Sequence, residues 1–205
     1  MTPGWQQIGA VWLPLPHVLN MLPVQVDRLY QSGAAAVAIS IASMALATGS
    51  LASLLLRTTG SLTAALAGAA LLMLNPNVLY LQSTPMTEPL LFGLSLLAIA
   101  STASWLDGWR DDERRPSIAL PAAALSAACM TRYEAWAIAG AVIALSLIVL
   151  LRRGVPLLRA ARASMQLAAF PAIAVVIFSM NSRWVVGEWV VTGGFFVPEN
   201  VEALG

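Results

Sequence analysis

The sequence predicts an all-α fold, a polytopic bundle of membrane helices forming a single transmembrane domain over residues 1–205. Fifty-nine per cent of the residues are hydrophobic and 10% are charged, whereas soluble domains carry about 25% charged residues. The apolar residues gather in long runs separated by short polar segments. Arginines, which supply every Lys or Arg position, concentrate in some of these polar segments and are sparse in others, as expected of a chain oriented in a membrane.

The first part of the chain, residues 1–32, is predicted to lie along the outer membrane interface. Its segment Trp12–His17 contains two prolines beside an aromatic residue, a pattern that favours a rigid interfacial segment over a spanning helix. His17 is the only histidine, and its imidazole suits a general base, a metal ligand or a hydrogen-bonding contact to substrate. Without a second histidine or a neighbouring carboxylate cluster, we favour a substrate contact or a structural role.

Six apolar segments are expected to form the membrane helices within residues 33–181. About 20 residues are needed to cross a ~30 Å hydrocarbon core, so three of the six are short for independent spans, and some are expected to be re-entrant. The residues 182–205 are expected to form an outer-face tail with a short strand or loop over Trp184–Asn200. In chain order the apolar segments are Gly33–Leu56, Leu62–Leu74, Pro89–Leu106, Ser117–Met130, Ala135–Leu151 and Met165–Met180.

The distribution of arginines predicts the orientation of these helices. Cytoplasmic loops are enriched in basic residues, and placing Arg57 inside puts eight of the eleven arginines there by alternation of the spans. The outer face then receives the connections Asn75–Glu88 and Thr131–Glu134 and both ends of the chain. Four tryptophans fall near the predicted helix ends, where interfacial anchors are common: Trp105, Trp109, Trp136 and Trp184.

The connection Asn75–Pro89 is the first candidate site. Pro76 disfavours helical geometry at Asn75, so the preceding helix is expected to end there. Thr87 is expected to cap the next helix, with Glu88 near its positive end. An ordinary helix hairpin explains Glu88 equally well. If the short preceding helix stops before the far interface, however, the connection dips inward, where irregular backbone must line protein or a wet cavity.

The tetrapeptide Thr131–Glu134 is the second candidate site. The apolar stretch around it is too long for one crossing, so we expect two helices that meet here. Ionisable residues between membrane segments commonly mark binding sites or pathways, and the planar guanidinium of Arg132 suits bidentate binding of a phosphate. A simple Arg132–Glu134 pair that anchors a helical hairpin is the alternative.

Several functional classes are excluded by the sequence. No glycine-rich phosphate loop, dinucleotide fingerprint, His-Glu-x-x-His motif or nucleophile elbow is present. No metal-ligand spacing is visible, and the single Cys129 reads as a packing residue. Nothing indicates a nucleic-acid partner. Without an internal repeat or polar groups on both faces, a secondary transporter is disfavoured.

The two polar connections together resemble a known family. Asn75–Pro89, followed by Thr131-Arg132-Tyr133-Glu134-Ala135-Trp136, is similar to the GT-C class of membrane glycosyltransferases, within it the bacterial dolichyl-phosphate-mannose–protein mannosyltransferase-like group. Trp12–His17 also resembles the segment that follows the first outer loop in this class. The resemblance covers most of the chain.

The resemblance implies an enzyme of the bacterial inner membrane that takes a sugar from a polyprenyl-phosphate donor on the periplasmic face and passes it to an acceptor whose identity is open. Several members of the class use a divalent metal. Their first helix and the acidic loop after it have no counterpart before Trp12, so the chain is expected to be an incomplete GT-C module. The alternative is a non-catalytic or degenerate protein that keeps the fold as a scaffold or partner subunit.

By the same resemblance, Glu88 is the candidate catalytic acid. The candidate substrate-binding residues are polar side chains of the three outer segments: His17, Asn75, Asn77, Gln82, Arg132 and Glu134.

Overall fold

A computed structural model describes residues 13–109, 117–185, 187 and 189. Throughout this part of the chain the regular secondary structure is helical, without strands. The predicted all-α class is therefore confirmed. The predicted strand or loop at Trp184–Asn200 begins inside the last helix, which continues to Val185, and its remainder lies outside the described residues apart from Gly187 and Trp189.

The described part of the chain starts with three short helical elements: α1 (Pro14–Asn20), the 3-10 helix η2 (Pro23–Gln25) and α2 (Asp27–Ser32). The prolines stand at the first helical positions of α1 and η2, where the missing N–H costs no intrahelical bond. Gly33 ends α2 with a φ of 66°, a left-handed conformation that glycine adopts without steric penalty. None of these elements is long enough to cross a bilayer.

Four helices have the length and composition of membrane spans: α3 (Ala34–Thr59), α6 (Glu88–Asp107), α8 (Glu134–Arg152) and α9 (Leu157–Val185). At 1.5 Å per residue, even the 19 residues of α8 extend over roughly 28 Å. Many large apolar side chains on these helices remain exposed in the isolated chain, among them Leu145, Ile173 and Ile177. Apolar helices with exposed apolar side chains suit a lipid environment, and the chain is an integral membrane protein.

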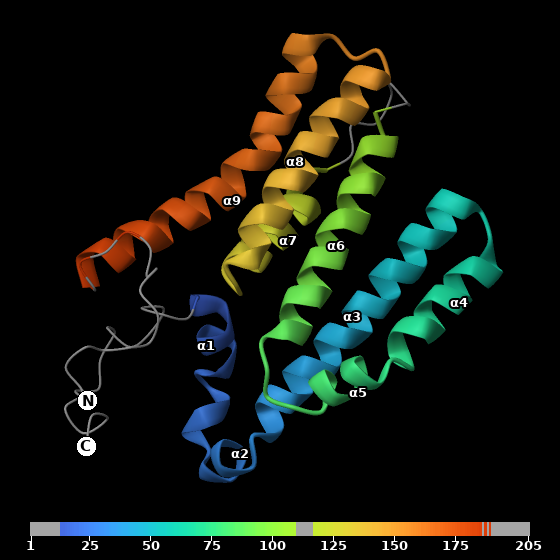
Figure 1. Cartoon of the computed structure of the whole chain (residues 1–205). Coiled ribbons are helices and arrows are strands. Elements are labelled where there is room, and N and C mark those ends of the chain that lie inside the picture. Colours follow the sequence, from blue (N-terminus) through green and yellow to red (C-terminus); the bar gives the residue numbers. More distant parts are fainter. Residues whose placement is uncertain (1–12, 110–116, 186, 188, 190–205) are drawn as a thin grey trace, which may run out of the picture.

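The helix α9 is longer than the predicted segment Met165–Met180. It is 29 residues long and extends beyond the predicted segment at both ends. Its first two turns include Arg159 and Arg162, which the prediction from the apolar run placed in a loop. Charged side chains are compatible with a helix end that extends beyond the hydrocarbon region. Pro171 lies inside α9, where a missing N–H favours a bend, and the helix changes direction along its length (Figure 1).

Two of the predicted short segments are indeed short helices. The helix α4 (Leu62–Met73) is followed by α5 (Pro76–Gln82), and the two are bent by 66° relative to each other. Together they form a broken span or a re-entrant pair. The helix α7 (Ala119–Cys129) has 11 residues, roughly 16 Å of helix, so it is too short to cross alone. The predicted division of Ser117–Leu151 into two helices is confirmed.

The helices place the polar connections at two opposite ends (Figure 1). The Glu88 end comprises α1, α2, α5, the start of α6 and the α7–α8 turn. The Asp107 end comprises the last turns of α3, α6 and α8 and the start of α9. The grouping matches the predicted alternation, whereas the assignment of either end to a side of the membrane stays a prediction.

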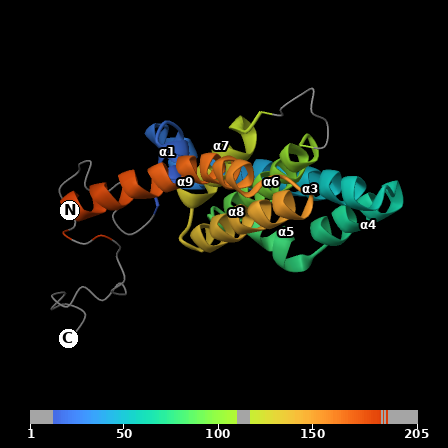
Figure 2. The same cartoon turned by 90° about the horizontal axis from the view of Figure 1, so that it is seen from above.

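The helix α6 is the central element of the bundle. It packs against α3 on one side and against α7 and α8 on the other, and Figure 2 shows α4 at one edge of the molecule with α6 near the middle. Small residues allow α3 and α6 to approach closely, as is usual between membrane helices. A Cβ atom added at Gly93 of α6 would lie 2.6 Å from the Ser43 carbonyl oxygen of α3.

At the Asp107 end, one carboxylate joins three helices. Asp107 accepts hydrogen bonds from Arg57 at 3.0 Å and from Arg153 at 2.9 Å, so the ends of α3 and α8 are both tied to α6. Arg57 also donates to the Ser104 hydroxyl at 2.7 Å, and Arg153 donates to the Leu106 carbonyl. Asp107 was not among the predicted site residues, and its role here is structural.

Candidate functional site

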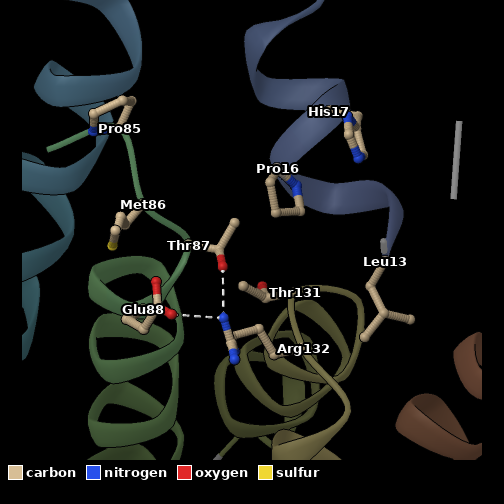
Figure 3. Close-up of a pocket in the computed structure, with 9 residues that line it drawn as sticks. All are labelled: Leu13, Pro16, His17, Pro85, Met86, Thr87, Glu88, Thr131 and Arg132. Carbon is tan, nitrogen blue, oxygen red and sulfur yellow. Dashed lines mark hydrogen bonds and ion pairs between the residues drawn. The ribbon is translucent and has the colours of Figure 1, made fainter. Parts of the chain in front are cut away.

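The polar centre of the Glu88 end is the guanidinium of Arg132. Its Nη1 donates to Glu88 Oε1 at 2.8 Å and to the Thr87 hydroxyl at 3.0 Å. Its Nη2 donates to Glu134 Oε1 at 2.8 Å, and its Nε is shared between both oxygens of the same carboxylate. Figure 3 shows Arg132 reaching from the α7–α8 turn to the start of α6. Residues 44 positions apart in the chain, Glu88 and Arg132, thus form one cluster.

Local backbone geometry places these side chains. Glu88 is the first residue of α6, where the helix dipole favours an acid. Thr87 precedes it at the cap position, but its side chain makes no cap hydrogen bond and instead accepts from Arg132. Arg132 lies in the short turn between Cys129, the last residue of α7, and Glu134, the first residue of α8. The predicted cap by Thr87 is therefore replaced by a longer-range contact.

A serine side chain of α3 holds the loop before α6 in place. The Ser40 hydroxyl is buried and lies 2.9 Å from the Thr84 carbonyl oxygen and 3.3 Å from that of Met86. Buried carbonyl groups need hydrogen-bond donors, and Ser40 supplies one to a segment that has no helix of its own. The position of Glu88 at the entrance of α6 therefore depends on this contact.

The cluster borders a pocket of about 320 Å³ at the Glu88 end. Thr87, Glu88, Thr131 and Arg132 supply its polar side. The rest of the lining is mainly apolar, with one imidazole. A facing wall comes from α1 and the residue before it, through Leu13, Pro16 and His17, whereas Pro85 and Met86 lie on the same side as Glu88, in the loop before α6 (Figure 3).

A main-chain hydrogen bond docks α1 against this pocket. The Leu15 N–H donates to the Met130 carbonyl at 2.9 Å. Leu15 is the second residue of α1, and the first N–H groups of a helix have no partner within the helix. Next to it, the side chain of Leu13 is 2% exposed. The hydrogen bond and this burial together bring the N-terminal segment to the α7–α8 turn.

An aromatic layer supports the turn on its other side. Tyr133, Trp136 and Phe178 make edge-to-face contacts with ring centroids 5.1–6.4 Å apart. Trp136 also donates its indole N–H to the Cys129 carbonyl at 2.9 Å. Burial raises the pKa of the Tyr133 phenol, and its buried hydroxyl has no hydrogen-bond partner among the described residues. The layer joins α9 to the turn that holds Arg132.

The cluster carries more negative than positive charge when both carboxylates are ionised. The hydrogen bonds that Arg132 donates to Glu134 and the nearby charge of Glu88 raise the pKa of Arg132 above its usual value, so the guanidinium remains protonated. The bonds described above use four of its five N–H groups, leaving one on Nη2 for a ligand. Arg132 and Glu88 are partly exposed, at 25% and 34% of their side-chain surface, and Glu134 more so, at 58%.

The structure brings together some of the predicted site residues and separates others. Arg132 contacts both Glu88 and Glu134 directly. His17 lines the facing wall and takes no part in their hydrogen bonds (Figure 3). Four predicted residues do not line this pocket: Glu134, which reaches it only through its contact with Arg132, and Asn75, Asn77 and Gln82. Asn75 caps α5 by accepting from the Asn77 N–H at 2.9 Å, as its position before Pro76 allows, and Gln82 is the last residue of α5.

Thr87 and Thr131 are pocket residues whose roles the sequence did not assign. Thr87 was expected only to cap α6, and no motif pairs it with Arg132. Within the described part of the chain, no three His, Cys, Asp or Glu side chains gather at a possible metal site. The described residues therefore do not form a divalent-metal site of the kind that several GT-C enzymes use, and no chemical step is assigned to such an ion.

Comparisons with known proteins give no relatives for this arrangement. No family model, curated protein or solved structure matches the chain.

Proposed function

We propose that the pocket at the Glu88 end binds the phosphate-sugar headgroup of a polyprenyl lipid, and that the chain acts as a membrane glycosyltransferase of GT-C type. In this proposal the Glu88 end faces the periplasm of a bacterial inner membrane. The observation that carries it is the contact of Glu88 with Arg132 beside a largely apolar pocket. An acid, a guanidinium and two threonine hydroxyls there suit a ligand with a phosphate and sugar hydroxyls.

The residues of the pocket have separate roles in this proposal. Arg132 binds the phosphate through its free N–H and through N–H groups released by the exposed Glu134. The acceptor hydroxyl oxygen attacks the anomeric carbon, the bond from that carbon to the phosphate oxygen breaks, and polyprenyl phosphate leaves. Glu88 receives the proton of the acceptor hydroxyl. His17 contacts the sugar or the acceptor from the α1 wall.

A second function is favoured by one observation. Four of the five N–H groups of Arg132 are already bonded within the chain. An arginine satisfied in this way also serves as a structural clamp between α6 and α8. The competing proposal is thus a non-catalytic membrane protein, a scaffold or partner subunit, in which the pocket has no ligand.

Ligand binding separates the two proposals. The whole chain, reconstituted in phosphatidylcholine nanodiscs, is titrated with a short-chain polyprenyl phosphomannose. A ligand-binding pocket predicts saturable binding that Arg132→Gln weakens by about tenfold or more, the scale of one charged hydrogen bond. Absence of saturable binding by the wild-type chain would refute the glycosyltransferase proposal and favour the clamp.

Two controls make this measurement specific. Arg28→Gln removes an exposed arginine from α2 at the same end, away from the pocket lining, and should leave the affinity unchanged. Glu88→Gln keeps the size of the side chain and, on this proposal, preserves binding better than sugar transfer. Equal losses for Arg28→Gln and Arg132→Gln would mean that the titration reports general electrostatic attraction only.

A further inference from the structure

A second cavity lies at the opposite, Asp107 end of the molecule. Its volume is about 430 Å³, and it is bounded by the end of α6, the start of α7 and the first three turns of α9. It shares no residue with the pocket around Arg132. Its lining consists of three basic or amide side chains among aromatic and aliphatic ones: Trp105, Trp109, Ile118, Arg159, Arg162, Ala163 and Gln166.

The polar groups of this cavity come from one face of α9. Arg159, Arg162 and Gln166 are spaced by three and four residues, so their side chains lie along the same side of the helix. In the described part of the chain neither arginine has an ion-pair partner. Asp107, the acid among the described residues at this end, is already shared by Arg57 and Arg153. The two guanidiniums are thus available to a ligand.

The opposite wall adds another donor. Trp109 packs edge-to-face on Trp105 with ring centroids 5.9 Å apart. The indole N–H of Trp109 is buried and has no acceptor among the described residues. Buried donors are nearly always paired. An orphaned donor in the lining of a cavity that holds two guanidiniums therefore points to a ligand rich in acceptor oxygens.

The apolar surface beside the cavity indicates which class of phosphate compound binds there. Next to the arginines, Leu158 and Met165 of α9 are 64% and 69% exposed, so the outer side of this helix is apolar. A phosphate group fits the donors, and acyl chains fit the apolar surface beside them. Basic pockets between membrane helices are known to hold the headgroups of anionic lipids. A purely water-soluble phosphate compound would leave this apolar surface without a role.

We propose that the cavity between α6, α7 and α9 is a binding site for the phosphate headgroup of an anionic membrane lipid. Arg159 and Arg162 bind the phosphate oxygens, and the Trp109 N–H donates to one of them. Gln166 contacts the polar part of the headgroup. The proposal is independent of the function assigned to the Glu88 end, since no residue or ligand is shared.

Retention of lipid by the purified chain tests this site. The whole chain is extracted in mild detergent, incubated with equal amounts of phosphatidylglycerol and phosphatidylcholine, and examined by native mass spectrometry. The wild type should retain phosphatidylglycerol preferentially. Arg159→Gln with Arg162→Gln should lower this retention by about tenfold or more, because two charge-assisted contacts are lost. Retention by the double variant equal to that of the wild type would overturn the proposal.

Arg152→Gln is the matched control. Arg152 is an exposed arginine at the end of α8, at the same end of the molecule, and does not line the cavity. Its replacement should leave the retention of phosphatidylglycerol unchanged. A loss as large as that of the double variant would mean that lipid retention depends only on the total positive charge, and would overturn the proposed site. Trp109→Phe removes the N–H but keeps a ring, and should weaken retention several-fold.

Two further arms identify the source of the phosphate. Inorganic phosphate at millimolar concentration should fail to displace phosphatidylglycerol, and effective displacement would overturn the lipid assignment in favour of a soluble anion. Asp111, Asp112 and Glu113 make an acidic segment of the sequence between α6 and α7, outside the described residues. Neutralising these three residues together should leave the preference unchanged. A large gain of lipid binding in that variant would mean that the acidic segment, rather than a lipid, occupies the cavity of the native chain.

Discussion

At the scale of single residues, Arg132 decides what the Glu88 end can do. Its guanidinium contacts the acid at the start of α6, the acid at the start of α8 and a threonine hydroxyl in the loop before α6. The same contacts that hold the helices together also leave few donors for a ligand. Binding and stability at this site are therefore linked through one side chain.

A double-mutant cycle measures this linkage. The coupling between Arg132→Ala and Glu88→Gln should be about 1 kcal/mol, reduced from the usual range of charged hydrogen bonds because both side chains are partly exposed. The coupling with Glu134→Gln should be smaller, since that carboxylate is 58% exposed. Equilibrium unfolding in mixed micelles gives both values. No measurable coupling to Glu88 would contradict the clamp seen in the structure.

Sequence reasoning identified Glu88, Arg132 and Glu134 because ionisable groups are conspicuous within apolar segments. The sequence could not reveal that Arg132 contacts both carboxylates, because this depends on how α6 meets the α7–α8 turn. The family resemblance places Asn75 and Asn77 among the candidate binding residues, but neither lines the pocket. Their short-range capping bond shows why local polar motifs near a site need not belong to it.

At the scale of helices, the α3–α6 pair is the contact most sensitive to side-chain size. Gly93→Ala would place a methyl group 2.6 Å from the Ser43 carbonyl oxygen, and the helices must move apart to admit it. We expect a loss of about 1–3 kcal/mol in unfolding free energy, the usual cost of overpacking. Steric-trap or micellar unfolding measurements provide the test.

Gly140→Ala is the matched control for that substitution. Gly140 also lies within an apolar helix, α8, but an added Cβ would meet nothing within 4 Å. Alanine favours helix over glycine by up to about 1 kcal/mol, so this variant should be neutral or more stable. If both variants lose equal stability, backbone approach at Gly93 is not the cause.

The shared carboxylate at the other end of α6 gives a second test of helix packing. Asp107→Asn keeps the side-chain volume but removes the charge that Arg57 and Arg153 share. Hydrogen exchange at the last turns of α3, α6 and α8 should become faster together, because one group ties all three ends. Acceleration confined to α6 would show that the ion pairs do not hold the neighbouring helices.

The sequence predicted the ends of a helix well where the helix ends at the same residues as the apolar run. It predicted them poorly where the helix continues into polar residues. The end of α4 before Pro76 and the break between α7 and α8 followed from proline geometry and from a charged tetrapeptide. The limits of α9 did not, because a helix that leaves the hydrocarbon region accepts Arg159 and Arg162 without ending. Hydropathy marks where lipid ends, and hydrogen bonding decides where the helix ends.

At the scale of the whole molecule, the arrangement separates two polar regions by the length of the bundle. The arginine distribution predicts which region faces the cytoplasm, but the folded helices alone fix only that the regions are opposite. The described helices can be compared with the six predicted apolar segments, three of which were expected to be too short for independent spans. Six apolar segments give four helices of spanning length, one bent pair and one short helix.

Labelling from the two sides of a membrane tests this arrangement. Asn77→Cys and Arg152→Cys introduce exposed thiols at the Glu88 and Asp107 ends, while the native Cys129 is 1% exposed and gives a low background. In oriented vesicles an impermeant maleimide should label one site from outside and the other only after permeabilisation. Labelling of both from the same side would contradict the opposed ends.

The bond between Leu15 and Met130 has a consequence for how this protein can change over time. Because both partners are main-chain groups, substitutions of either side chain leave the hydrogen bond in place, and only proline at position 15 removes its donor. The side chains at these two positions can therefore be substituted in evolution while α1, which carries His17, stays bound to the α7–α8 turn. Related chains with different side chains at both positions can retain the same docking of α1.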